Sequence, residues 1–243
     1  MTNQLESKLI LIIGGTSGFG LEVAKAAVLS EARLVLIGRD PKKAEAVAGS
    51  LKDAGHQVDG FAIDATDADA LGGILKQVGP VDHMVSTVGG AMGGGFLEAD
   101  LGVIRDTVKG KFDDNLVIAR TVAPFLAEGG SMTFTAGSGG RPDNASGAII
   151  GNQAIAGLVK GLAVELAPRR RANAVAPTWT PTPLWRNVPS DQVEATRAQF
   201  AEQIPLGRTG EPAEIAEAFL FLMSCNFITG QTLTVDGGYS LIG

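Results

Sequence analysis

Three glycines with the spacing GxxxGxG, Gly14, Gly18 and Gly20, carry the clearest chemical signal in the sequence. They follow five aliphatic residues, 9–13, which are typical of a strand buried on both faces of a parallel sheet. An apolar helical pattern begins directly after them. A strand, a tight glycine turn and a helix N-terminus together predict a site for a dinucleotide pyrophosphate, because unpaired N–H groups and the positive helix end attract phosphate. The other interpretation is an ordinary turn between a strand and a helix.

The segments that must position this turn alternate between strand and helix patterns along the whole chain. This alternation predicts an α/β fold with a doubly wound, Rossmann-type parallel sheet of seven strands and helices on both faces. No Pro/Ser-rich linker divides the 243 residues, so we expect a single domain, 1–243. The expected strands are 9–13, 33–37, 58–63, 83–86, 131–135, 172–176 and 232–235, and the expected helices include 19–30, 41–54, 103–126 and 148–167.

Composition narrows the class of protein. The net charge of −6 argues against a general nucleic-acid surface or an anionic membrane surface as partner. The single cysteine, Cys225, cannot form an intrachain disulfide and fits a reducing compartment. The polar start 1–8 is unlike a secretory signal, and no apolar run is expected to approach the length of a membrane span. We therefore expect a cytoplasmic protein, and we assign no metal-binding residues.

The chain resembles a short-chain dehydrogenase/reductase from end to end. The residues that carry the resemblance are the GxxxGxG run, Asp64 after the third strand, GLAVELAP at 161–168 with NAVAP at 173–177, and ITGQ at 228–231 with VDGG at 235–238. The resemblance implies a nicotinamide cofactor, a small-molecule substrate, and a homodimer or homotetramer. The apolar helix 148–167 independently favours a homo-oligomer, because one core face cannot cover all its aliphatic side chains.

The cofactor half of this pattern favours NADP(H). Gly38 stands where an acidic residue would bind the ribose of NAD, and Arg39 directly after it can grip a phosphate at two points. The other interpretation is that Arg39 is a solvated surface cation. The resemblance assigns Asp64 to the adenine and Thr182 to the nicotinamide amide or the phosphates. The expected cofactor-binding residues are Gly14, Thr16, Ser17, Gly18, Phe19, Gly20, Arg39, Asp64, Ala65, Gly89 and Thr182.

The catalytic half departs from the family. The resemblance places the usual Ser, Tyr, Lys and Asn at Gly137, Ala148, Asn152 and Lys111. Three residues are candidates to replace them. Lys111 could donate a proton if burial lowers its pKa, or it could be an exposed cation. Ser138 could polarise a carbonyl or only cap the backbone, and Asn152 could hydrogen-bond the ribose.

The remaining candidates are weaker. Arg141, Asp143 and Asn144 share the loop of Ser138, whereas His56, His83 and the only tyrosine, Tyr239, are expected to be structural or solvated. Trp179, Trp185 and Phe200 occupy an expected substrate lid at 178–204. They predict an apolar or aromatic substrate or, equally, a hydrophobic cluster beneath a long loop.

Two hypotheses about function follow. The first is an NADP(H)-dependent oxidoreductase that acts on an activated carbonyl or a conjugated alkene through an atypical proton donor. The second is a catalytically silent NADP(H)-binding protein that serves as a sensor, partner or scaffold.

Overall fold

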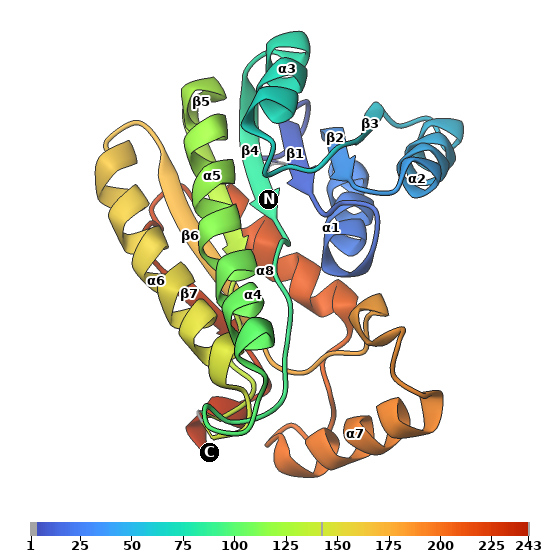
Figure 1. The fold of residues 1–243 in the computed structure, drawn as a ribbon. Coiled ribbons are helices and arrows are strands. Elements are labelled where there is room, and N and C mark those ends of the chain that lie inside the picture. Colours follow the sequence, from blue (N-terminus) through green and yellow to red (C-terminus); the bar gives the residue numbers. More distant parts are fainter. Residues whose placement is uncertain (1–3, 142, 243) are drawn as a thin grey trace.

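The computed structural model describes residues 4–141 and 143–242. Its centre is a sheet of seven parallel strands in the order β3-β2-β1-β4-β5-β6-β7 (Figure 1). This arrangement confirms the doubly wound sheet expected from the alternating pattern. The strands are β1 (Leu9–Ile13), β2 (Arg33–Gly38), β3 (Val58–Ala62), β4 (Val81–Ser86), β5 (Leu126–Thr135), β6 (Arg171–Pro177) and β7 (Thr232–Val235).

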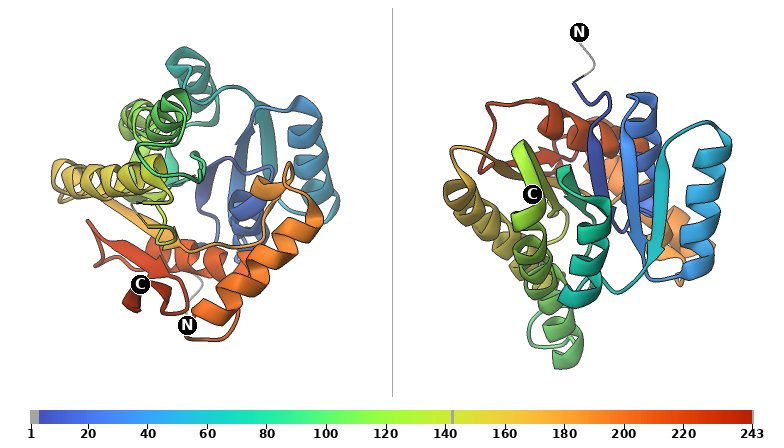
Figure 2. Two further views of the ribbon diagram at one scale, coloured as in Figure 1. Left: turned by 60° about the horizontal axis from the view of Figure 1, so that its bottom comes forward. Right: turned by 90° about the horizontal axis from the view of Figure 1, so that it is seen from above.

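Helices cover both faces of the sheet, as Figure 2 shows in two further views. One hydrophobic core joins the sheet to α3, α5 and α6, and the other joins it to α1, α2 and α8. The helices are α1 (Gly18–Leu29), α2 (Pro41–Asp53), α3 (Ala68–Val78), α4 (Leu101–Lys111), α5 (Asp113–Val122), α6 (Ser146–Leu166), α7 (Ser190–Gln203) and α8 (Pro212–Ser224), with short 3₁₀ turns η1 (Ala123–Phe125), η2 (Pro183–Trp185) and η3 (Tyr239–Leu241).

The strand order reverses beside β1, which pairs with β2 on one side and β4 on the other. In open parallel sheets, ligands bind outside the carboxyl ends of the strands at such a reversal. We call this side of the molecule the carboxyl edge. The glycine turn after β1, the loop after β4 and helix α7 of the expected lid segment all lie toward this edge, and α7 lies at the bottom of Figure 1. The fold therefore gathers the expected cofactor and lid residues at one edge.

The expected single helix 103–126 is wrong. The chain forms two helices, α4 and α5, separated by Phe112, and it enters β5 at Leu126. Basic residues in the last turn of α4 and Asp113 and Asp114 in the first turn of α5 each complement the dipole of their own helix end. These charges indicate the break in the sequence, but the helical pattern that continues across them favoured a single helix.

One expectation about membranes also needs correction. Helix α6 is long and apolar enough to cross a membrane by length and composition alone, although no segment was expected to come close. In the fold it serves as a core helix, because Ile155 and Val159 are fully buried against the sheet. Its apolar character therefore has a structural explanation.

Candidate cofactor and active site

The turn after β1 has the backbone that a phosphate-binding loop needs. Gly14 has a φ of +84° and Gly18 a φ of +52°, a region that favours glycine. A side chain at Gly14 would overlap Thr87 Oγ1, and one at Gly20 would overlap the carbonyl oxygen of Gly14. Thr87 also donates from its N–H and its hydroxyl to the carbonyl of Ile13. The loop after β4 thus braces the glycine turn, and sequence reasoning missed Thr87 in this role.

The N-terminus of α1 is open to an anion. Ser17 precedes the helix but makes no capping hydrogen bond with its side chain, and no acidic residue lies in the first turn. The N–H groups in the first turn of α1 are therefore available to a negatively charged ligand. Thr182, at the start of η2, lies across from Gly18, with its Cβ 3.9 Å from where a Cβ of Gly18 would lie. The structure brings these expected cofactor contacts together.

An acidic side chain at Gly38, at the end of β2, would require Thr16 to move. A Cβ there would lie 2.6 Å from Thr16 Oγ1, because the Thr16 side chain covers this position. Arg39 beside it is exposed and makes no hydrogen bond or ion pair within residues 4–141 and 143–242. Hydrogen bonds from the N–H and hydroxyl of Thr66 lower the pKa of nearby Asp64, to which Arg39 also contributes. Among the described residues, the Arg39 guanidinium at the end of β2 is thus exposed and makes no hydrogen bond or ion pair of its own.

Lys111, the last residue of α4, is buried, with only 7% of its surface exposed. Its side chain runs between two glycines. A Cβ at Gly89 would lie 3.1 Å from its Cγ and 3.8 Å from its Nζ, and a Cβ at Gly151 would lie 2.5 Å from its Cδ. Burial lowers the pKa of the Lys111 ammonium to about 8, and the structure gives it no carboxylate partner among the described residues. The exposed-cation interpretation of Lys111 is therefore wrong.

Asn115 fixes the backbone of Lys111 to the end of β4. Its amide nitrogen donates to the carbonyls of Lys111 at 2.8 Å and Val88 at 3.2 Å. Its amide oxygen accepts from the hydroxyl of Ser86 at 2.6 Å, so both polar atoms of this fully buried side chain have hydrogen-bond partners. The break between α4 and α5 is thereby held against the carboxyl edge, which places Lys111 beside the loop after β4.

Asn152 faces the turn that follows β5. A Cβ at Gly137 would lie 2.8 Å from its Nδ2, and its Oδ1 is buried without a partner in the described structure. An acceptor in this state fits a ligand hydroxyl, such as one on a ribose. Asn152 follows Gly151 in α6, and the side chain of Lys111 on α4 packs against Gly151, so the lysine stem reaches α6 one position before Asn152.

Ser138 is not brought to the same place. Gly137, the residue before Ser138, is the one that faces Asn152. The hydroxyl of Ser138 is buried without a regular hydrogen bond and lies near Asp236. Burial opposes ionisation of Asp236, but hydrogen bonds from Ser240 and Gly238, helped by Ser138, keep its pKa below the usual value. The geometry directs Ser138 to Asp236 rather than to Lys111.

The other polar residues of this loop hold the loop itself. The Arg141 guanidinium donates to both carboxylate oxygens of exposed Asp143, and the Arg141 N–H donates to Asn144 Oδ1. Gly94, in the loop after β4, forms a parallel bridge with Ala145. The two loops that flank Lys111 and Asn152 are thus joined to each other.

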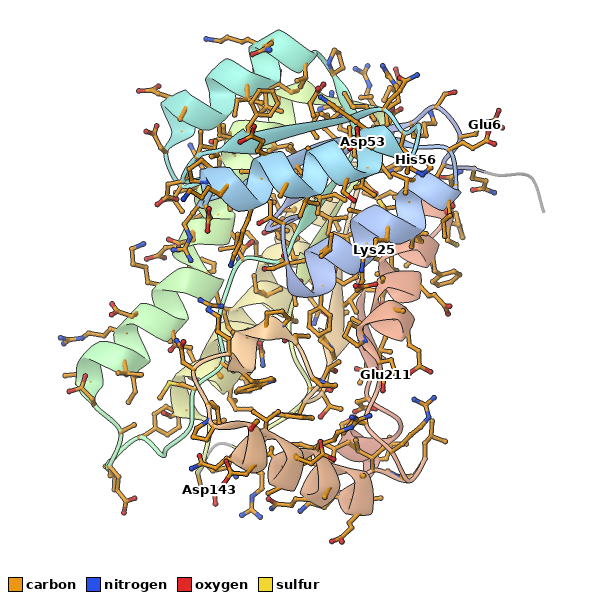
Figure 3. The ribbon with its side chains drawn as sticks, turned by 90° about the vertical axis from the view of Figure 1, so that its right-hand side faces the viewer. Glu6, Lys25, Asp53, His56, Asp143 and Glu211 are labelled. Carbon is orange, nitrogen blue, oxygen red and sulfur yellow. The ribbon has the colours of Figure 1, made fainter. Side chains whose placement is uncertain are left out.

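The histidines and Tyr239 lie apart from this chemistry. His83 is buried, with its Nδ1 2.9 Å from Ser131 Oγ, and burial lowers its pKa to about 4. Figure 3 shows His56 at the far end of the molecule from Asp143. Tyr239 packs on Phe200, with ring centroids 5.4 Å apart. The structural interpretation of these residues is confirmed for His83.

The lid aromatics form a cluster. Trp179 stacks on Trp185 at 5.9 Å and on Phe200 at 5.8 Å, with interplanar angles of 22° and 15°. Trp185 Nε1 also donates to the carbonyl of Thr180. The rings therefore pack mainly on one another, as in a hydrophobic cluster beneath a loop, and they anchor the lid to the end of β6.

Comparisons with known proteins agree with this geometry. The sequence matches a family model described as enoyl-(acyl carrier protein) reductase over residues 14–240. Galactitol 2-dehydrogenase (L-tagatose-forming) of Cereibacter sphaeroides is 33% identical over 253 residues, covering 98% of this chain and 97% of that protein. Carbonyl reductase family member 4 of Danio rerio is 30% identical, covering 97% and 99% respectively.

Solved structures give the same result. A short-chain dehydrogenase/reductase from Serratia marcescens superposes with a TM-score of 0.87 at 26% identity, covering 98% of this chain and 99% of that one. A small-chain dehydrogenase in complex with NADPH has a TM-score of 0.80 at 28% identity, covering 97% and 100%. With the glycine turn, the parallel sheet and a family match along nearly the whole chain, this protein belongs to the short-chain dehydrogenase/reductase family of oxidoreductases, whose members use nicotinamide cofactors.

Proposed function

We propose that the protein is an NADP(H)-dependent oxidoreductase that acts on an activated carbonyl or a conjugated alkene, with Lys111 as its proton donor. The observation that carries the proposal is the buried Lys111 ammonium, whose pKa is lowered to about 8. A proton donor works best when its pKa lies near the working pH. The charge of an unpaired buried lysine is also costly, so it is retained where it serves a ligand or a reaction.

The residues at the carboxyl edge fit a reduced dinucleotide. Gly14, Gly18 and Gly20 with the α1 N-terminus would hold the pyrophosphate, and Arg39 the extra phosphate of NADPH. Asn152, with its unpartnered Oδ1, would accept from the nicotinamide ribose. When bound, the cofactor supplies the hydride. Lys111 then gives a proton from Nζ to the substrate oxygen, so that a carbonyl gains one hydride and one proton.

The proposed substrate class follows from the acid that remains, Lys111 without the family's Tyr, and from the side chains on the surface around it. A positioned general acid contributes about 10²–10⁴-fold to a rate, so simple ketones suffer most where the family's Tyr is replaced by Ala148. Quinones and enones depend less on the acid, because their hydride adducts are stabilised anions. Large apolar side chains are exposed on the loop after β4, at Phe96 and Leu97, and on the lid, at Leu184 and Val188. They favour an apolar or aromatic substrate.

We propose further that the protein works in the cytoplasm as a homodimer or homotetramer. Ile150 and Val164 on α6 are 41% and 79% exposed, and Leu101 and Val103 on α4 are also exposed. Contacts between copies of the chain would remove these side chains from water.

NADPH oxidation with a panel of quinones, enones and ketones tests the oxidoreductase. We expect turnover on the activated substrates, and Lys111→Met to lower kcat by about 10²-fold, the low end of a general acid's contribution, because these substrates depend less on the acid. Lys109→Met is the matched control, because Lys109 lies on the same helix but is exposed and bound to Asp114. Turnover in Lys111→Met at the wild-type rate would overturn the role of Lys111. Tight NADPH binding with no turnover on any substrate would instead support a catalytically silent binding protein.

A further inference from the structure

Helix α6 contains four glycines, at Gly147, Gly151, Gly157 and Gly161. Glycine in a helix interior is unfavourable relative to alanine, because it loses more backbone entropy on folding. Gly157 and Gly161 have open space where a Cβ would lie. Gly147 packs against the loop after β4 and α4, where a Cβ would approach the sulfur of Met92 and the carbonyl of Ile104. Gly151 differs from all three in what surrounds it.

The three atoms nearest to a Cβ at Gly151 all belong to Lys111. They are Cδ at 2.5 Å, Cβ at 2.8 Å and Cγ at 3.1 Å. A contact below 3.0 Å requires one of the two groups to move. Cβ and Cγ of Lys111 lie close to the lysine backbone, and Cβ can move only if that backbone moves. That backbone cannot yield easily, because Asn115 holds the carbonyl of Lys111. An alanine at 151 would therefore displace the Lys111 side chain.

Gly89 is a second glycine that packs against the Lys111 side chain. Its φ of +134° is a conformation that side-chain-bearing residues rarely adopt, and a Cβ there would lie 3.1 Å from Lys111 Cγ. The lysine stem thus runs between a strand-end loop and a helix that both lack side chains at the point of contact. Its Nζ emerges beside Gly89, in the loop after β4.

We propose that Gly151 is a positioning residue for Lys111: its missing side chain admits the lysine stem against α6 and so carries Nζ to the carboxyl edge. The consequence for catalysis rests on the proposed function, whereas the packing relationship does not. A positioning role predicts that Gly151 matters only while the lysine stem is present.

A stability cycle tests the packing directly. In the wild-type background, Gly151→Ala should lower the midpoint of urea unfolding, because the new methyl group overlaps the lysine stem. In the Lys111→Gly background, which removes Cβ as well as Cγ and Cδ, the same substitution should raise the midpoint, as an ordinary glycine-to-alanine change in a helix does. Gly157→Ala is the matched control and should raise the midpoint in both backgrounds. A Gly151→Ala effect of the same sign in both backgrounds would overturn the proposal.

A kinetic cycle tests the consequence on the best substrate of the panel. Gly151→Ala should lower kcat at least tenfold and leave the KM for NADPH within twofold of wild type. It should lower kcat no further when Lys111→Met is already present. If Lys111→Met retains wild-type turnover, the proposed function fails while the stability cycle still decides the packing. If the sign reversal is absent, the positioning role fails whatever the kinetics show.

Discussion

The amide of Asn152 fills the space in which a side chain at Gly137 would lie, since a Cβ there would stand 2.8 Å from Nδ2 and 3.3 Å from Oδ1. The two positions therefore constrain each other. Gly137→Ser should lower the free energy of unfolding by about 1–3 kcal/mol, the usual cost of overpacking. Asn152→Ala should remove most of that loss. Urea denaturation of both single variants and the double variant measures the coupling, and additive effects would show that the two residues do not compete for space.

This competition bears on restoring the family's usual catalytic groups. We expect little wild-type turnover on unactivated ketones. Gly137→Ser, Ala148→Tyr and Asn152→Lys together should raise ketone reduction, whereas each alone should do little, because groups that act as a unit are strongly non-additive. NADPH oxidation with simple ketones compares the three single variants and the triple variant with the wild type. Robust ketone reduction by the wild type, with a bell-shaped pH profile, would contradict this expectation and show that the wild type already contains an efficient acid.

Arg39 should give the protein a preference for NADPH. We expect NADPH to bind at least about tenfold more tightly than NADH, or about 1.4 kcal/mol, and Arg39→Ala to abolish the difference. Arg33→Ala is the control. Arg33 is the first residue of β2, at the end of the strand opposite to Arg39, and its side chain donates to the carbonyl of Ser7. Isothermal titration with both nucleotides measures the affinities. Equal affinities in the wild type would contradict the assignment of Arg39.

Lys111 should make stability depend on pH in the alkaline range. Its pKa is lowered from 10.5 to about 8, so below pH 8 both folded and unfolded chains carry the proton and the full penalty applies, about 3 kcal/mol. Between pH 8 and 10.5 the folded chain releases its proton first, so the free energy of unfolding rises with pH. Lys111→Met should therefore raise Tm at pH 7 by several degrees and remove this rise.

Thermal melts of wild type, Lys111→Met and Lys109→Met from pH 7 to 10 check this prediction. The difference between the first two curves isolates Lys111 from other groups that titrate in this range. Lys109→Met should follow the wild type, since Lys109 is exposed. Parallel curves for wild type and Lys111→Met would show that the buried ammonium titrates normally.

The exposed apolar side chains of α6 predict an oligomer. Sedimentation equilibrium at micromolar concentration should give a dimer or tetramer of the 25.0 kDa chain. Val164→Glu together with Ile150→Glu should shift the protein toward monomer, because two charges would be buried in the contact. Leu29→Glu on α1, also an exposed apolar position, should not. A wild-type monomer would refute the assignment of this surface.

Local patterns predicted the parts of this molecule that depend on nearby residues. The glycine turn after β1 and the strands β1 and β2 follow from runs of aliphatic residues that end at glycine, whereas β5 begins five residues before the expected strand 131–135. The break at Phe112 was missed, although Lys109, Asp113 and Asp114 marked it. The local helical periodicity was given more weight than these charges, because a charge indicates a helix end only when the position of that end is already known.

The candidate active site was less predictable, because its properties arise from contacts distant in sequence. The burial of Lys111 depends on Gly89 and Gly151, which other elements bring to it. Ser138 was selected for its type and its place in the loop after β5, yet in the folded chain it lies near Asp236. For the lid aromatics the sequence allowed either the lining of a substrate pocket or a hydrophobic cluster beneath a loop. Only their stacking geometry distinguishes the two.

The aromatic cluster of the lid has a spectroscopic consequence. The chain contains two tryptophans and one tyrosine, and all three belong to the stack of Trp179, Trp185, Phe200 and Tyr239. Intrinsic fluorescence and near-ultraviolet dichroism of this protein therefore come largely from one corner of the molecule. An optical melting curve records the release of the lid from the end of β6. Loss of the sheet itself registers in calorimetry or far-ultraviolet dichroism, so a gap between the two transitions measures how independently the lid moves.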